Sequence, residues 1–107
     1  MSYYEGDRIL AQWNGGSFWF AGRVHSVGSD DSVAVQYDDG MSDIRPASQV
    51  KPFDWTEGSA IDAIWSGNGH WYAAHITQLD PDNNTVGVRF DDDGIEETRG
   101  TGQCRSR

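Results

Sequence analysis

The chain of 107 residues has one cysteine, three prolines and no long apolar run. With Cys104 as its single thiol, it can form neither an internal disulfide framework nor a zinc site made of several thiolates. No segment approaches the roughly 20 apolar residues of a membrane-spanning helix, and the N-terminus lacks a signal-peptide core. These absences predict an intracellular protein with no membrane partner.

Basic residues are also scarce, because 8 Lys and Arg face 17 Asp and Glu, for a net charge of −9. Affinity for nucleic acid depends on basic side chains that release counterions from phosphates, so nucleic acid is the least favoured partner. An acidic surface attracts basic peptides by long-range steering. Acidity can also serve solubility alone, and the net charge does not decide between these two uses.

The patterns of catalysis and metal binding are missing as well. No Ser or Cys stands near a base in a pattern typical of nucleophilic catalysis, and no glycine-rich phosphate loop precedes a predicted helix. The segment from Asp80 to Asp91 imitates part of a calcium loop, but Thr85 replaces the required glycine. We therefore expect no enzyme activity, no metal and no cofactor.

Glycine and aromatic residues, in contrast, are abundant, with 13 Gly, five Trp, four Tyr and four Phe. Many glycines between short apolar runs favour turn-rich β structure over helical bundles. Aromatic side chains bury large areas, so a few of them can hold a small domain together, and they also form binding surfaces. Composition leaves both uses open.

The sequence contains an internal repeat of about fifty residues. Residues 6–13, Gly-Asp-Arg-Ile-Leu-Ala-Gln-Trp, match residues 58–65, Gly-Ser-Ala-Ile-Asp-Ala-Ile-Trp. Further along, residues 33–39, Val-Ala-Val-Gln-Tyr-Asp-Asp, match residues 86–92, Val-Gly-Val-Arg-Phe-Asp-Asp. The chain is therefore a duplication.

Each copy alternates with the period of two that is typical of half-buried strands, as in Ile9, Ala11 and Trp13. Clusters of Gly, Asn and Asp separate the strands, as in hairpins. A meander of four or five short strands closes on itself as a small barrel. We predict an all-β fold of two small antiparallel barrels in tandem, packed against each other, with domains at residues 1–53 and 54–107.

The two copies end differently. The first ends in residues 44–52, which offer a helical turn and a closing fifth strand. The second ends in residues 100–107, Gly-Thr-Gly-Gln-Cys-Arg-Ser-Arg, without an apolar pair. The second barrel is therefore either incomplete at its C-terminus or completed by the region of Tyr3 and Tyr4 or by the first copy. On this ground the first copy is the slightly favoured binding site.

Aromatic residues recur at three matched places: the end of strand one, the start of strand two and the end of strand three. The pairs are Trp13 and Trp65, Phe20 and Tyr72, Tyr37 and Phe90. In a meander these three places meet at one rim. Three rings around one point attract a cation through their quadrupoles, by roughly 0.5–2 kcal/mol per contact. Methylation spreads the charge of an ammonium over a poorly hydrated group, which favours such a ring cage.

Acidic residues follow the third ring in both copies, and they include Asp39 and Asp92. A carboxylate beside the rings accepts a charge-assisted hydrogen bond from a mono- or dimethylammonium proton. A trimethylammonium has no such proton, so an acid-edged cage should prefer lower methylation states. The same rings are equally compatible with core packing, and the acids with ordinary hairpin turns.

These motifs resemble a known family. Residues 18–24, Phe-Trp-Phe-Ala-Gly-Arg-Val, and residues 35–40, Val-Gln-Tyr-Asp-Asp-Gly, closely resemble Tudor domains of the Royal superfamily, and residues 70–76 and 88–94 of the second copy look similar. The resemblance extends from residue 6 to about residue 99. The order is similar to tandem Tudor readers of methylated histone tails and to plant Agenet modules.

The resemblance implies SH3-like barrels, a nuclear protein and a cage in each copy that binds methylated lysine. It places the cage residues at Trp13, Phe20, Tyr37 and Asp39, and at Trp65, Tyr72, Phe90 and Asp92. Where many such domains carry a fourth ring, this sequence has Met41 and Ile95, so each cage is open on one side. Two alternatives stay open: a methylarginine reader of Arg/Gly-rich proteins, and a structural or assembly protein without a live cage.

Overall fold

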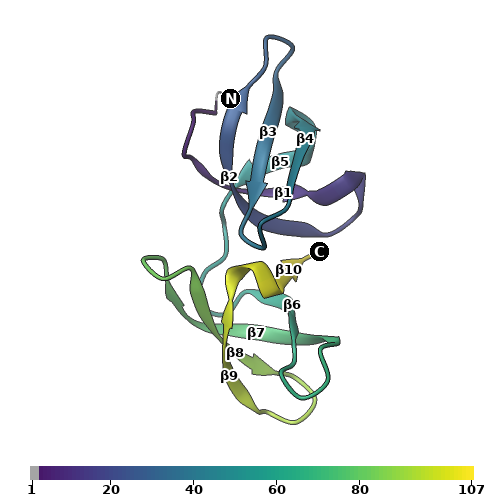
Figure 1. The fold of residues 1–107 in the computed structure, drawn as a ribbon. Helices are drawn as coiled ribbons and strands as arrows, with labels where there is room; N and C mark the ends of the chain where they lie inside the picture. Colours follow the sequence, from purple (N-terminus) through teal and green to yellow (C-terminus); the bar gives the residue numbers. More distant parts are fainter. Residues whose placement is uncertain (1–2) are drawn as a thin grey trace. The chain divides into compact units, whose positions relative to one another are not determined.

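The computed structural model describes residues 3–107 as β-strands joined by turns and short 3-10 segments. The chain divides into two compact units, of which the first ends at Asp54 and the second covers Trp55–Ser106 (Figure 1). In residues 3–107, no helix has the length and apolar character needed to cross a membrane.

Unit 1 is an antiparallel meander in which the pairing order is β5-β1-β2-β3-β4. Its elements are β1 (Arg8–Gln12), η1 (Trp13–Gly15), β2 (Trp19–Val27), β3 (Ser32–Tyr37), β4 (Ser42–Pro46), η2 (Ala47–Gln49) and β5 (Val50–Pro52). The short closing strand β5 returns to pair with β1 through Ala11 and Val50.

Unit 2 repeats this topology in the order β10-β6-β7-β8-β9. Its elements are β6 (Ala60–Ile64), β7 (Trp71–Asp80), β8 (Thr85–Phe90), β9 (Glu96–Gly100), η3 (Thr101–Gln103) and β10 (Cys104–Ser106). The predicted all-β class, with two small antiparallel barrels in tandem, is confirmed.

The second strand of each unit is long and bent. In unit 1 a bulge interrupts the pairing of β2 with β3 between Val24 and Ser26, and in unit 2 the same irregularity lies between Ile76 and Gln78. A bulge bends the strand and increases its twist. One long strand can therefore pair with the first strand along its N-terminal half and with the third along its C-terminal half.

The core of unit 1 follows the alternation in the sequence. Its buried members are Ile9, Ala11, Val24, Val33, Val35, Tyr37 and Val50, and Tyr3 and Phe20 pack against them. The hydroxyl of Tyr3 donates to the carbonyl oxygen of Val50 at 3.1 Å. Tyr3 therefore completes the first unit, which corrects the alternative that its region completes the second barrel.

The closing strand of unit 2 was not evident in the sequence. Strand β10 pairs with β6 through Cys104 and Ala63, as β5 pairs with β1 in unit 1. Cys104 takes the place of Val50 and is completely buried. Because a free cysteine packs like a small apolar residue, a single thiol supplies what the missing apolar pair would have supplied.

The closing strands also cover the two tryptophans that begin β2 and β7. The ammonium of Lys51 lies 4.6 Å from the ring centroid of Trp19, and the guanidinium carbon of Arg105 lies 4.3 Å from that of Trp71. Arg105 Nε is also 3.3 Å from the buried carboxylate of Asp62. One face of each tryptophan is thus occupied by a cation of its own unit.

We expect Cys104 to resist alkylation in the native protein. Burial raises the pKa of its thiol to about 12, so almost no thiolate exists at pH 8. Iodoacetamide at pH 8 should therefore modify the native chain far more slowly than the chain unfolded in urea, as measured by intact mass. Equally fast modification of both states would show that β10 does not remain paired with β6.

Two Tyr→Phe substitutions should shift stability in opposite directions. Tyr37→Phe removes a buried hydroxyl that has no hydrogen-bond partner among the described residues, and should raise the free energy of unfolding by about 1 kcal/mol. Tyr72→Phe removes a hydroxyl that accepts from Asn68 Nδ2 at 2.7 Å, and should lower it by about 0.5 kcal/mol. Urea unfolding midpoints check both signs. A less stable Tyr37→Phe variant would contradict the unpaired state of its hydroxyl.

Candidate functional site

Unit 2 contains a small pocket of about 130 Å³. Its lining residues are Trp65, Tyr72, Ala73, Phe90, Asp92 and Asp93. All four residues that the sequence assigned to the second cage thus line one cavity, together with Ala73 and Asp93. The volume lies well below the roughly 300–1,000 Å³ of pockets for drug-sized ligands, so it suits a small headgroup.

The meander brings the three rings of this pocket to one place. Trp65 follows β6 directly, Tyr72 is the second residue of β7 and pairs with Ala63, and Phe90 ends β8 and pairs with Ala74. Tyr72 and Ala74 are two positions apart and lie on the same side of β7. The rings therefore come from three neighbouring strands at the same rim of the barrel.

The rings differ in exposure and orientation. Trp65 and Tyr72 stand nearly perpendicular, with centroids 6.1 Å apart and an interplanar angle of 84°. Phe90 is buried, whereas 37% of Tyr72 is exposed. A buried phenylalanine and two rings at right angles thus line one small volume. The faces of aromatic rings are the negative ends of their quadrupoles and attract a cation.

The loop between β6 and β7 folds back on the indole of Trp65. The backbone N–H of Trp65 donates to His70 O at 3.0 Å, and that of Gly69 donates to Trp65 O at 2.9 Å. A Cβ added at Gly67 would lie 2.5 Å from the Trp65 ring. Glycine at this position therefore lets the loop backbone lie directly against the indole.

The acidic turn differs from the expected arrangement. Asp39 accepts a hydrogen bond from Met41 N at 2.9 Å, and Asp93, not Asp92, accepts the equivalent bond from Ile95 N at 3.0 Å. Asp93 is thus the structural counterpart of Asp39, and Asp92 is the inserted residue. The sequence alignment missed Asp93, although its position two residues before Ile95 was a usable signal.

The first acid of each turn is already paired within its unit. Arg8 donates two hydrogen bonds to Asp38, at 2.6 and 2.5 Å. In unit 2, His75 Nδ1 lies 2.7 Å from Asp91 Oδ1. The later carboxylates are the ones that edge the pocket of unit 2. In the described part of the chain, no group of three or more His, Cys, Asp or Glu side chains is arranged to hold a metal ion.

Unit 1 brings together two of its predicted rings in a different setting. Phe20 and Tyr37 meet edge to face, with centroids 6.5 Å apart and an angle of 87°. Tyr37 belongs to the buried core, and burial, reinforced by the carboxylate of Asp43, raises the pKa of its phenol. Trp13 lies on η1 and is 42% exposed. Asp39 lies in the exposed turn after β3.

A basic side chain lies close to the loop that carries Trp13. Arg45 Nη1 would be 3.1 Å from a Cβ added at Gly15, and Arg45 Nε is 3.1 Å from Asp43 Oδ2. The carboxylate of Asp43 thus balances the charge of this guanidinium. The two predicted sites differ in which ring is most exposed, Trp13 in unit 1 and Tyr72 in unit 2.

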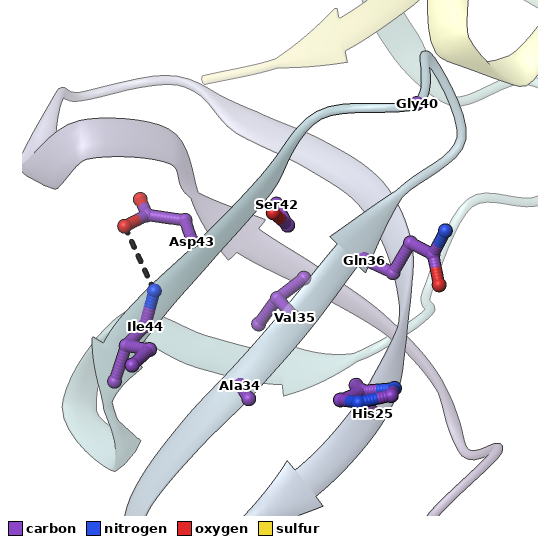
Figure 2. Close-up of a pocket in the computed structure, with 8 residues that line it drawn as sticks. All are labelled: His25, Ala34, Val35, Gln36, Gly40, Ser42, Asp43 and Ile44. Carbon is purple, nitrogen blue, oxygen red and sulfur yellow. Dashed lines mark hydrogen bonds between the residues drawn. The ribbon is translucent and has the colours of Figure 1, made fainter.

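A larger hollow of about 510 Å³ lies along β3 and β4 of unit 1 (Figure 2). Its lining residues are His25, Ala34, Val35, Gln36, Gly40, Ser42, Asp43 and Ile44. None of them is Phe, Trp or Tyr, and none belongs to the predicted cage. Greater volume here does not provide the aromatic faces that a cation site requires.

No family model matches this chain. A short segment is similar to the survival of motor neuron-related splicing factor 30 of Xenopus tropicalis, with 39% identity over 36 residues. That match covers 34% of this chain and 15% of the splicing factor. The chain thus corresponds to a small part of this relative.

Solved structures give a fuller match. The tandem Tudor domains of Crb2 superpose with a TM-score of 0.64 at 20% identity, over 100% of this chain and 82% of theirs. The tandem Agenet domains 3–4 of ADCP1 have a TM-score of 0.44 at 19% identity, over 98% of this chain and 80% of theirs, and this weaker similarity adds nothing about the fold. Together with the duplicated five-strand topology, the first match shows that the chain has the fold of tandem Tudor domains.

Proposed function

We propose that this protein is a non-catalytic binding module that recognises a methylated lysine on a basic peptide. The proposed peptide is a histone tail in the nucleus. The ligand side chain enters the pocket formed by Trp65, Tyr72 and Phe90, with Asp92 and Asp93 at its edge. The observation that carries the proposal is that the four residues assigned to this cage from the sequence line one small cavity.

The chemistry of the pocket suits a methylated ammonium. Perpendicular aromatic faces attract a cation, and the attraction grows when the cation is poorly hydrated, as a methylated one is. A carboxylate at the edge accepts the remaining N–H of a mono- or dimethylammonium. With two edge carboxylates instead of one, the preference for lower methylation states is stronger than the sequence alone suggested.

The charge of the protein favours a basic partner. The net charge of −9 steers Lys/Arg-rich segments toward the surface and repels phosphates. Asp92 and Asp93 line the pocket, Asp91 precedes them, and Glu96 and Glu97 follow on β9. Basic residues that flank a modified lysine in the bound peptide would therefore lie close to these carboxylates.

Unit 2 is the proposed primary site and unit 1 a weaker one. The preference for the first copy rested on its closing strand, and unit 2 has an equivalent strand in β10. In unit 2 the four assigned residues line one cavity, whereas in unit 1 Phe20 packs edge to face on Tyr37 and Trp13 is 42% exposed on η1. Trp13, Phe20, Tyr37 and Asp39 therefore form the poorer cation site.

Peptide titration tests this proposal. Histone-tail peptides with zero to three methyl groups on one lysine, and a dimethylarginine peptide, are titrated while amide and indole NMR shifts are followed. We expect the mono- and dimethyllysine peptides to bind best and to shift Trp65 and Tyr72. Trp65→Ala should weaken binding about tenfold, since it removes one cation–ring contact.

Trp13→Ala is the matched control, because it removes the equivalent ring from unit 1, and it should weaken binding less than Trp65→Ala. Equal NMR shifts with methylated and unmethylated peptides would refute the proposal and favour a structural role. A preference for the dimethylarginine peptide would instead assign the same pocket to a methylated guanidinium.

A further inference from the structure

A carboxylate on the last-but-one strand of unit 2 holds the loop that carries Trp65. Glu97 on β9 accepts two hydrogen bonds from Ser66, the residue that follows Trp65. The backbone N–H of Ser66 lies 3.3 Å from Glu97 Oε1, and its hydroxyl lies 2.5 Å from Oε2. Glu97 is 31 residues away in the sequence, so this contact ties the loop to a distant strand.

Unit 1 contains the same connection at the equivalent position. Asp43 on β4 accepts a hydrogen bond at 2.8 Å from the backbone N–H of Asn14, the residue that follows Trp13. Asp43 pairs with Val35 in the sheet, as Glu97 pairs with Val88. The contact therefore recurs at the same register in two copies whose side chains differ, Asp in one and Glu in the other.

Neither carboxylate belongs to the predicted cages, and Glu97 does not line the pocket. Its effect passes through the backbone of Ser66 to the indole one residue earlier. On the other side of the same loop, Asn68 donates to the hydroxyl of Tyr72 at 2.7 Å. The loop is thus attached to β9 by Ser66 and to the second cage ring by Asn68.

We propose that Glu97, and Asp43 in unit 1, are positioning residues that hold the cage tryptophan in place before any ligand arrives. A surface loop with small residues such as Ser66, Gly67 and Gly69 has many conformations to lose on ordering. A charge-assisted bond from a strand restricts the loop in the free protein. Binding then costs less ordering of the indole, which is the benefit of preorganisation.

The two copies differ in how fully the carboxylate is engaged. Glu97 accepts from both donors of Ser66. Asp43 accepts from Asn14 only through the backbone N–H, shares that Oδ2 with Arg45 at 3.1 Å, and accepts from Ile44 N through its Oδ1. The loop of Trp65 is therefore held more firmly than that of Trp13. This inference deepens the proposed function of the unit 2 pocket, but the positioning itself exists without a ligand.

The test compares Glu97→Ala with Glu96→Ala in the full chain. Glu96 is adjacent, exposed and equally charged, so the pair separates the specific contact from the general loss of one negative charge. The readout without ligand is the indole N–H resonance of Trp65, assigned with Trp65→Phe, and its cross-relaxation with the Tyr72 ring. We expect Glu97→Ala to shift and broaden this resonance and to remove the cross-peak, while Glu96→Ala changes neither.

Affinity for the best methylated peptide is the second readout. Glu97→Ala should weaken it about tenfold and Glu96→Ala about twofold or less. Glu97→Gln keeps an acceptor oxygen without the charge, and Ser66→Ala removes only the hydroxyl donor. Both should give intermediate shifts of the Trp65 resonance, and they remain informative if Glu97→Ala does not fold.

The outcomes separate the two proposals. If Glu97→Ala or Glu97→Gln leaves the Trp65 resonance and its cross-peak as in the wild type, the positioning role is overturned, whatever binds. If the resonance shifts but the wild type binds no methylated peptide, the positioning role stands and the proposed function falls.

Discussion

The fold depends on one strand in each unit that pairs with both neighbouring strands at two consecutive residues. Gly22 of β2 faces Ile9 on one side and Tyr37 on the other, and Ala74 of β7 faces Ile61 and Phe90. An added Cβ at Gly22 would lie 2.7 Å from the backbone oxygen of Gln36, so glycine permits this close approach. Because this shared position fixes the first, second and third strands together, it also sets where their rings meet.

The ring positions could be predicted because they depend on local pattern and strand order alone. Period-two alternation assigns Tyr72 and Phe90 to one face, and a meander places their ends at one rim. The details that escaped prediction depend on register or on distant contacts. One extra residue in a turn decides whether Asp92 or Asp93 matches Asp39. Because no apolar residue alternates with Cys104 in the sequence, the pattern did not predict a strand there. In the structure, Cys104 pairs with Ala63 as part of β10.

The two units share their backbone arrangement but differ in several side chains. Both units keep the bulge in the second strand, the cation over the tryptophan that begins it, and the carboxylate that holds the first loop. They differ in that Tyr37 of unit 1 corresponds to Phe90 of unit 2, and Asp43, which is paired with Arg45, corresponds to Glu97, which accepts a hydrogen bond from Ser66. Conserved hydrogen bonds with altered side chains indicate that the scaffold was retained while the two rims diverged.

In unit 2, the core and the proposed binding site therefore share Phe90 but otherwise occupy different parts of the barrel. The core is made of strand residues such as Val86 and Val88, which are buried and fixed by the ladder. In the proposed site of unit 2, Phe90 belongs to that core and Tyr72 to β7, whereas Trp65, Asp92 and Asp93 belong to loops that hydrogen bonds hold in place. A hydrogen-bonded loop can change with little cost to the core, because few buried apolar contacts depend on it. Substitutions at residues such as Ser66 and Asn68 can consequently alter the proposed site while the barrel itself persists.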